Sequence, residues 1–74
     1  MRAKFGIFRD KDGGYDGKPW YVGSPDLTNI EMIWDDGKVH IGGRDLITRE
    51  TRGWFKTREE ARRAYRKYRL TNAR

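Results

Sequence analysis

The chain has 74 residues, no cysteine, and 17 Lys or Arg against 11 Asp or Glu, which gives a net charge of +6. This length predicts one domain, residues 1–74, and the lack of cysteine excludes a disulfide framework and a thiolate metal site. No apolar run reaches the roughly 20 residues that span a bilayer. Arg9 and Asp10 come too early for the apolar part of a signal peptide. We therefore expect a soluble, cytoplasmic protein.

The charge is divided unevenly along the chain. Residues 1–37 hold five Lys or Arg and seven Asp or Glu, whereas residues 38–74 hold twelve and four. A split of this kind indicates an oriented surface rather than a uniform charge that only keeps the protein soluble. Eleven of the basic residues are Arg, whose planar guanidinium favours bidentate contacts with phosphates, base edges and carboxylates.

Two strands are predicted in the first third of the chain. Residues 3–9 alternate in a strand pattern, with Phe5 and Ile7 on one face. Residues 10–18 are rich in Asp and Gly and predict a turn region. A second strand follows at 20–23.

The clearest strand signal is a hairpin that follows a loop at 24–29. Segments 30–35 and 38–42 flank Asp36-Gly37, a dipeptide typical of a two-residue type I′ turn. That turn would pair Trp34 with Val39 and would set the two faces of the hairpin. The predicted core face holds Ile30, Met32, Trp34, Val39 and Ile41. The predicted outer face holds Glu31, Ile33 and His40.

The last third of the chain predicts one capped helix. Residues 45–49 indicate a short strand or an extended loop, and Trp54-Phe55 indicates the end of a strand. Thr57 then caps the helix and Glu60 completes a capping box. An apolar stripe at helical spacing packs on the sheet; it consists of Ala61, Ala64, Tyr65 and Tyr68. The expected fold class is α+β: a small antiparallel sheet of three to five strands, with one C-terminal α-helix packed on one face.

The start of this helix resembles a known DNA-binding family. The shared residues are Phe55, Thr57, Glu59, Glu60, Ala61, Arg63, Ala64 and Tyr65. They are similar to the strand-to-helix junction of the plant ethylene-response-factor DNA-binding domain and of the arm-site DNA-binding domain of tyrosine integrases. The resemblance implies a helix behind a three-stranded sheet, with the sheet entering the major groove of DNA through Arg and Trp side chains. It covers about eleven residues and carries over no base-contacting residue.

The candidate binding residues all lie in the basic half of the chain. The helix segment carries six Lys or Arg against two acids, and a domain that concentrates charge in this way typically meets a polyanion. The alternative interpretation is a solvated helix face that keeps the protein soluble. The predicted contact residues are Arg44, Arg49, Arg52, Trp54, Lys56, Arg58, Arg62, Arg66 and Arg69.

Two functions are consistent with this pattern. The first is a small basic nucleic-acid-binding module that uses an Arg-rich sheet edge and the C-terminal helix, with DNA favoured over RNA. The second is a small phage-type protein that binds and modulates a host protein, such as a nucleic-acid enzyme, through an acidic surface of that partner. We expect no membrane partner, no small-molecule substrate and no cofactor.

Catalytic and metal-binding patterns are absent from the sequence. His40 is the single histidine, and no cysteine accompanies it as a metal ligand. Segment 10–16 begins like a calcium loop, but Tyr15 stands where that loop needs Gly. The carboxylates form no convincing acid–base pair, so we expect no enzymatic activity. The aromatic content predicts instead an exposed patch on the sheet, formed by Phe8, Tyr21, Ile33 and Trp54.

Overall fold

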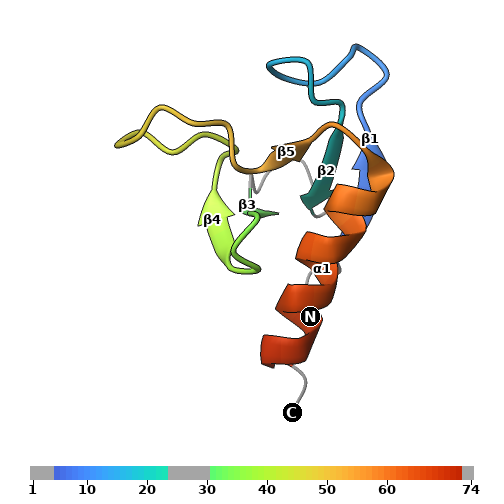
Figure 1. Ribbon diagram of the computed structural model, residues 1–74, viewed down its shortest axis with the longest axis vertical. Helices are drawn as coiled ribbons and strands as arrows, with labels where there is room; N and C mark the ends of the chain where they lie inside the picture. Colours follow the sequence, from blue (N-terminus) through green and yellow to red (C-terminus); the bar gives the residue numbers. More distant parts are fainter. Residues whose placement is uncertain (1–4, 24–30, 73–74) are drawn as a thin grey trace.

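One helix crosses one face of a small antiparallel sheet (Figure 1). The computed structural model describes residues 5–23 and 31–72. The strand order is β1-β2-β3-β4, and β5 pairs with β2. The elements are β1 (Gly6–Arg9), β2 (Trp20–Gly23), β3 (Glu31–Ile33), β4 (Val39–Ile41), β5 (Trp54–Phe55) and α1 (Arg58–Asn72). The predicted α+β fold class is confirmed. The expectations for residues 1–4, 24–30 and 73–74, Ile30 of the core face among them, lie outside the described residues.

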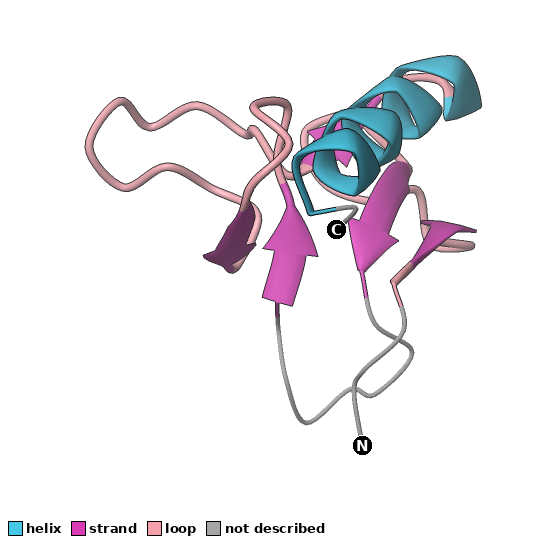
Figure 2. Cartoon of the chain, turned by 90° about the horizontal axis from the view of Figure 1, so that it is seen from below, coloured by secondary structure: helices cyan, strands magenta, loops and turns pink. Residues whose placement is uncertain are grey.

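The core lies between the sheet and α1 (Figure 2). Val22 and Ile33 are fully buried there, with Phe55 from β5 beside them. Ala61 and Ala64 supply the helix side of this core. Their small side chains let the helix backbone approach the strands closely. Larger, partly buried side chains close the margins of the layer: Phe5, Ile7, Trp20, Tyr65 and Tyr68.

Side chains at the start of α1 satisfy its free N–H groups as the sequence predicts. The Glu60 N–H donates to Thr57 Oγ1 over 3.2 Å. Glu60 Oε1 in turn accepts from the Lys56 N–H over 3.1 Å, one residue before the cap. The helix therefore begins where local chemistry places it, and its apolar stripe meets the sheet.

The predicted register of the β3–β4 hairpin is wrong by one residue. Ile33 pairs with Val39 and Met32 with His40, so Trp34 lies opposite Lys38 rather than Val39. Ile33 therefore lies in the core with no exposed surface. Of the predicted core residues in β4, Val39 is 41% exposed and Ile41 is 70% exposed. Met32 and Trp34 are buried as expected, but on the face opposite α1.

The hairpin loop explains this shift. It contains three residues, Asp35, Asp36 and Gly37, and Gly37 has a φ of 78°. A third loop residue in the left-handed region is a common alternative to the two-residue turn, and it moves every later side chain to the other face. Gly37 is buried under α1, where an added Cβ would lie 2.6 Å from the Cβ of Lys67. Packing against the helix therefore favours the longer loop.

An aromatic ladder crosses the sheet face that α1 leaves open. Phe8 and Tyr21 have ring centroids 5.6 Å apart, and Tyr21 and Trp54 have centroids 4.8 Å apart. All three side chains are half-buried. They lie together on one sheet face as the sequence predicts, but they are half-buried rather than exposed, and Ile33 belongs to the core on the other side.

Another hairpin, between β4 and β5, projects from the body at the left of Figure 1. Residues 43–53 form this feature, which we call the finger. The segment 45–49, predicted as a short strand or an extended loop, is its turn. Arg44 pairs with Thr51 in an antiparallel bridge, and the N–H groups of Arg52 and Gly53 both donate to the Gly43 carbonyl.

Candidate functional site

Arg52 is the centre of a cluster of acidic side chains. Its guanidinium lies 2.9 Å from Asp35 Oδ1, 3.3 Å from Asp45 Oδ2 and 3.8 Å from Asp36 Oδ2. It also lies over the Trp34 ring, 5.2 Å from the ring centroid. The hydrogen bond with Asp35 is the leading cause that raises the pKa of Arg52. This predicted contact residue therefore already has three carboxylate partners within the fold.

The same cluster lowers the pKa values of Asp36 and Asp45. Burial acts to raise the pKa of Asp36, but a hydrogen bond from the Lys38 N–H, together with His40 and Arg52, holds it below its ordinary value. Hydrogen bonds from the N–H groups of Ile47 and Thr48, with the Arg52 pair, lower the pKa of Asp45. His40 Nε2 lies 3.0 Å from Asp36, and its ring stacks on Trp34 with centroids 3.8 Å apart. In residues 5–23 and 31–72, no group of His, Cys, Asp and Glu side chains is suited to hold a metal.

The helix arginines differ sharply from Arg52. Within the described part of the chain, no carboxylate lies within 4 Å of any guanidinium on α1. Glu59 and Arg63, one helical turn apart, form no ion pair, and Glu60 is engaged in the helix cap. Among the described residues, therefore, no ion pair offsets the charge of the α1 arginines.

Four of these arginines follow one side of α1, as their spacing predicts. We call this set the basic flank: Arg58, Arg62, Arg66 and Arg69. Arg62, Arg66 and Arg69 line an open groove of about 590 Å³ between α1 and Ile7 of β1, and Glu59 is the acidic residue of its lining. Tyr65 forms part of the groove wall, and the Arg69 guanidinium lies 5.9 Å from the centre of its ring. With a rise of about 1.5 Å per residue, the flank is about 16 Å long.

The opposite side of α1 is chemically mixed. A groove of about 310 Å³ there is lined by Lys18, Arg63 and Lys67, but also by Asp35 and Glu60. Lys18 Nζ donates to the Thr51 carbonyl over 3.1 Å, and Lys67 Nζ donates to the Asp35 carbonyl over 3.1 Å. Lys67 therefore ties α1 to the β3–β4 turn, and Lys18 ties the β1–β2 loop to the finger, so both lysines are less available to a partner than the basic flank.

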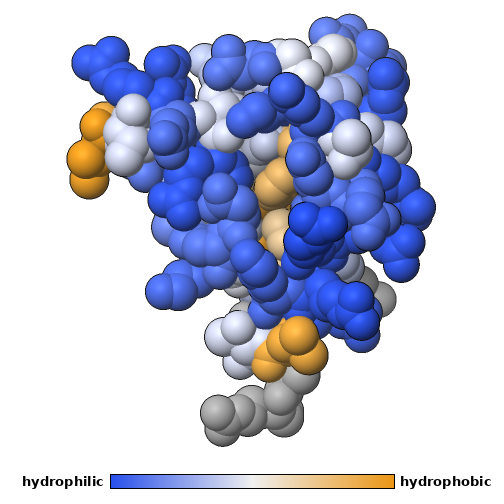
Figure 3. Space-filling view, in the orientation of Figure 1, coloured by the Kyte–Doolittle hydropathy of each residue, from blue (hydrophilic) through white to orange (hydrophobic). Residues whose placement is uncertain are grey.

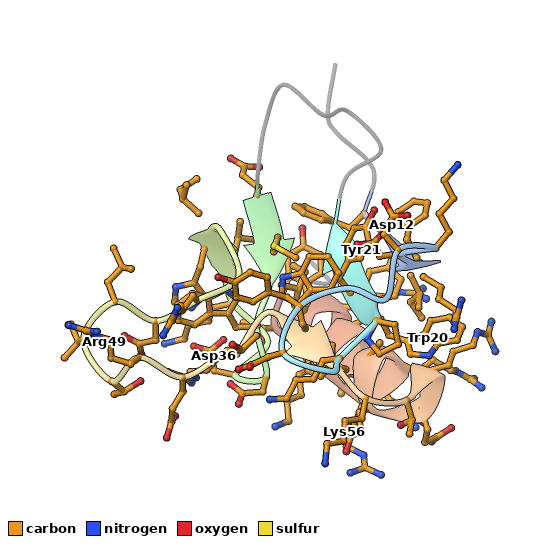
Figure 4. All side chains as sticks on the ribbon, turned by 90° about the horizontal axis from the view of Figure 1, so that it is seen from above. Asp12, Trp20, Tyr21, Asp36, Arg49 and Lys56 are labelled. Atoms are coloured by element: carbon orange, nitrogen blue, oxygen red, sulfur yellow. The ribbon has the colours of Figure 1, made fainter. Side chains whose placement is uncertain are left out.

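The remaining predicted contact residues lie apart from the flank. Arg44 and Arg49 are exposed on the finger, and Arg49 points away from the body (Figure 4). Lys56 is exposed just before α1, whereas Trp54 lies in the aromatic ladder of the open face. The structure thus divides the predicted set into the basic flank with Lys56, the finger, the acidic cluster at Arg52 and the open face.

Two apolar residues were missed by the sequence predictions. Leu46 is 83% exposed and Ile47 is 92% exposed, at the tip of the finger. In Figure 3 an orange, apolar surface at the left marks the projecting finger, apart from the apolar surface at the centre and bottom of the view. The sequence feature that could have indicated their exposure is the isolated apolar pair between Asp45 and Thr48, which is too short to belong to a core strand.

None of the protein-family models, curated proteins or solved structures compared with this chain matches it. No helix in residues 5–23 and 31–72 combines the length and the apolar character that crossing a membrane requires.

Proposed function

We propose that this protein is a nucleic-acid-binding module that holds duplex DNA along the basic flank of α1. The observation that carries the proposal is the contrast between Arg52, which three carboxylates surround, and the flank, whose guanidiniums have no acidic partner in the described residues. A fold that pairs one arginine so fully leaves the others free for an external anion. Arg is suited to this role because its planar fork makes bidentate contacts with phosphate.

The dimensions of the basic flank fit a phosphate backbone. The flank is about 16 Å long, and one DNA strand carries a phosphate for about every 3.4 Å of helix axis, so the flank is long enough to face more than one phosphate of a strand. Four guanidiniums over that length match a continuous anion better than a single charged group. The adjoining groove gives the backbone a concave surface beside Ile7 and Tyr65.

This assignment places DNA on the helix side of the molecule. The family resemblance at residues 55–65 implies the opposite, with the sheet entering a groove of DNA. On the open face, however, Arg52 is already paired with Asp35, Asp36 and Asp45. A phosphate there would meet a cation that three carboxylates surround. Phosphates would meet uncompensated guanidiniums on the flank, and this favours the helix as the binding element.

A protein partner is the second candidate function. The aromatic ladder of Phe8, Tyr21 and Trp54 is half-buried on a sheet face without a covering helix. Aromatic side chains often dominate the energy of protein interfaces. In this case the ladder would be the contact surface, and the protein partner would still bind when nucleic acid has been digested.

Fluorescence anisotropy with short labelled DNA and RNA tests the DNA proposal. We expect the duplex to bind at low salt, with affinity falling steeply as salt is added. The variant Arg62→Gln/Arg66→Gln should bind about tenfold more weakly and reduce the salt slope by about 1.8, at about 0.9 per lost phosphate contact. Lys11→Gln/Lys38→Gln is the matched control, since it removes the same charge at exposed positions away from α1. Equal losses in both variants, or no binding by the natural chain, would contradict the proposal.

A further inference from the structure

The finger presents apolar side chains where the fold does not need them. Leu46 and Ile47 lie at its tip and are the two most exposed of the large apolar side chains in the described residues, at 83% and 92%. Both stand between the exposed cations Arg44 and Arg49. Two apolar groups held in water beside two arginines suggest a contact surface for a partner.

The finger is ordered by its own hydrogen bonds. Asp45 Oδ1 accepts from the N–H groups of Ile47 and Thr48, at 2.9 and 3.4 Å, and the Asp45 N–H donates to the Glu50 carbonyl over 2.8 Å. At the base, the Trp34 Nε1–H donates to the Gly42 carbonyl over 2.8 Å. A partner would therefore meet a preformed tip and would not need to order this loop, which favours affinity.

Arg49 has an unusual backbone conformation for its residue type. Its φ is 70°, in the left-handed region, where glycine is comfortable and a larger residue is strained. Its carbonyl accepts a hydrogen bond from Arg44 Nε, but its guanidinium makes no hydrogen bond or ion pair with the described residues. The fold therefore gains nothing from this side chain that would offset the strain. Such strain often marks a residue with a binding role.

We propose that the finger enters the minor groove of duplex DNA and inserts Leu46 and Ile47 between stacked base pairs, while Arg44 and Arg49 contact phosphates on either side. Small apolar wedges beside arginines are the chemistry by which proteins open and kink the minor groove. The Asp45 carboxylate is held by the Ile47 and Thr48 N–H groups and by Arg52, which it shares with Asp35 and Asp36. Glu50 is the one acid of the finger without an ion pair.

This inference rests on the proposed DNA binding. It further specifies that the finger contacts the minor groove, that the duplex bends, and that base-pair steps which unstack easily are preferred. A short duplex labelled at both ends reports the bend by energy transfer, and anisotropy reports affinity. A central TA step should bind more tightly than a rigid A-tract, since pyrimidine–purine steps unstack more easily. The variant Leu46→Ser/Ile47→Thr should lose the bend and bind about tenfold more weakly, with an unchanged salt slope because no phosphate contact is removed.

Single substitutions provide matched controls. Ile47→Thr should reduce both bend and affinity, whereas Ile41→Thr replaces another exposed isoleucine, in β4, and should change neither. Arg49→Gly should relax the backbone and leave the protein at least as stable, while lowering the salt slope by about 0.9. Weaker binding without loss of stability would separate a contact role for Arg49 from a structural one.

The possible failures can be told apart. If Leu46→Ser/Ile47→Thr binds and bends DNA like the natural chain, the wedge is refuted and DNA binding by the basic flank stands. If the natural chain binds no DNA, both proposals fail. If vesicles of anionic phospholipid bind the natural chain but not this variant, while DNA binding is the same for both, the tip serves a lipid surface and the wedge is refuted.

Discussion

Arg52 Nη2 lies 2.9 Å from Asp35 Oδ1 and joins the finger to the β3–β4 hairpin. Asp35 belongs to the β3–β4 turn, whereas Arg52 closes the base of the finger, where its Nη1 lies 3.3 Å from Asp45 Oδ2. The Asp35 N–H also donates to the Arg52 carbonyl over 3.2 Å. One arginine thus orients the finger, whereas the arginines of the basic flank make no ion pair with the described residues.

Replacement of Arg52 should cost stability more than the loss of an exposed arginine. Arg52→Gln removes three carboxylate contacts and the cation over Trp34, and leaves three acids close together. Thermal unfolding should show a midpoint several degrees lower, since one lost interaction moves the midpoint of a small domain by about that much. Arg58→Gln, which removes the same charge where no ion pair forms, should leave the midpoint nearly unchanged. Equal midpoints for the two variants would show that the Arg52 cluster does not stabilise the fold.

The hairpin register can be tested by truncating its two isoleucines. Ile33→Ala should destabilise the protein by about 2–4 kcal/mol, because Ile33 is fully buried between sheet and helix. Ile41→Ala should cost less than about 1 kcal/mol, because Ile41 is 70% exposed. Urea unfolding followed by Trp fluorescence measures both. The reverse order would support the two-residue turn.

The contact between the β3–β4 hairpin and α1 depends on Gly37. Gly37→Ala introduces a Cβ close to the Lys67 side chain at a φ of 78°, so the strained backbone and the collision both oppose it. We expect a loss on the order of 3 kcal/mol. Gly17→Ala is the control: its φ of 72° is similar, but its Cβ would meet no atom within 4 Å. That variant should lose only about 1–2 kcal/mol of backbone strain. A similar loss in both variants would show that the close approach of α1 does not require glycine at position 37.

The acidic cluster should make stability fall in acid. The pKa values of Asp36 and Asp45 are lowered in the folded protein, so their contribution is present above the unfolded value of about 3.9 and is lost as pH falls through the folded values. Asp45→Asn keeps an oxygen for the Ile47 and Thr48 N–H groups but removes the charge facing Arg52. The variant should be less stable than the natural chain near neutral pH, and the difference should shrink below about pH 4. A difference that does not change with pH would exclude the ion pair as its cause.

The helix and the fold class were predictable because their signals are local. Thr57 and Glu60 lie within one turn, and Ala61 and Ala64 repeat at helical spacing, so neighbouring residues alone specify a capped amphipathic helix. The same holds for the basic flank, because helical geometry sets its spacing. Sequence periodicity thus located the surface on which the proposed function depends.

The register and the finger were not predictable because distant contacts decide them. Lys67 and Asp35 are 32 positions apart, yet their contact and the burial of Gly37 favour the three-residue loop. Arg52 looked like any other cation of the basic half, since its partners Asp35 and Asp45 meet it only in the folded chain. Local turn chemistry alone predicts the two-residue turn, and the position of Arg52 in the basic half predicts it as a contact residue.

An amide chemical-shift titration with a short DNA duplex at low salt tests the central claim most directly. If the basic flank holds DNA, the largest changes should fall on residues 58–70 of α1, with a second set at residues 44–51 of the finger. The strands of the open face should change little, and Arg62→Gln/Arg66→Gln should reduce the changes along α1. Changes confined to the aromatic ladder of Phe8, Tyr21 and Trp54, or no changes at all, would contradict the account.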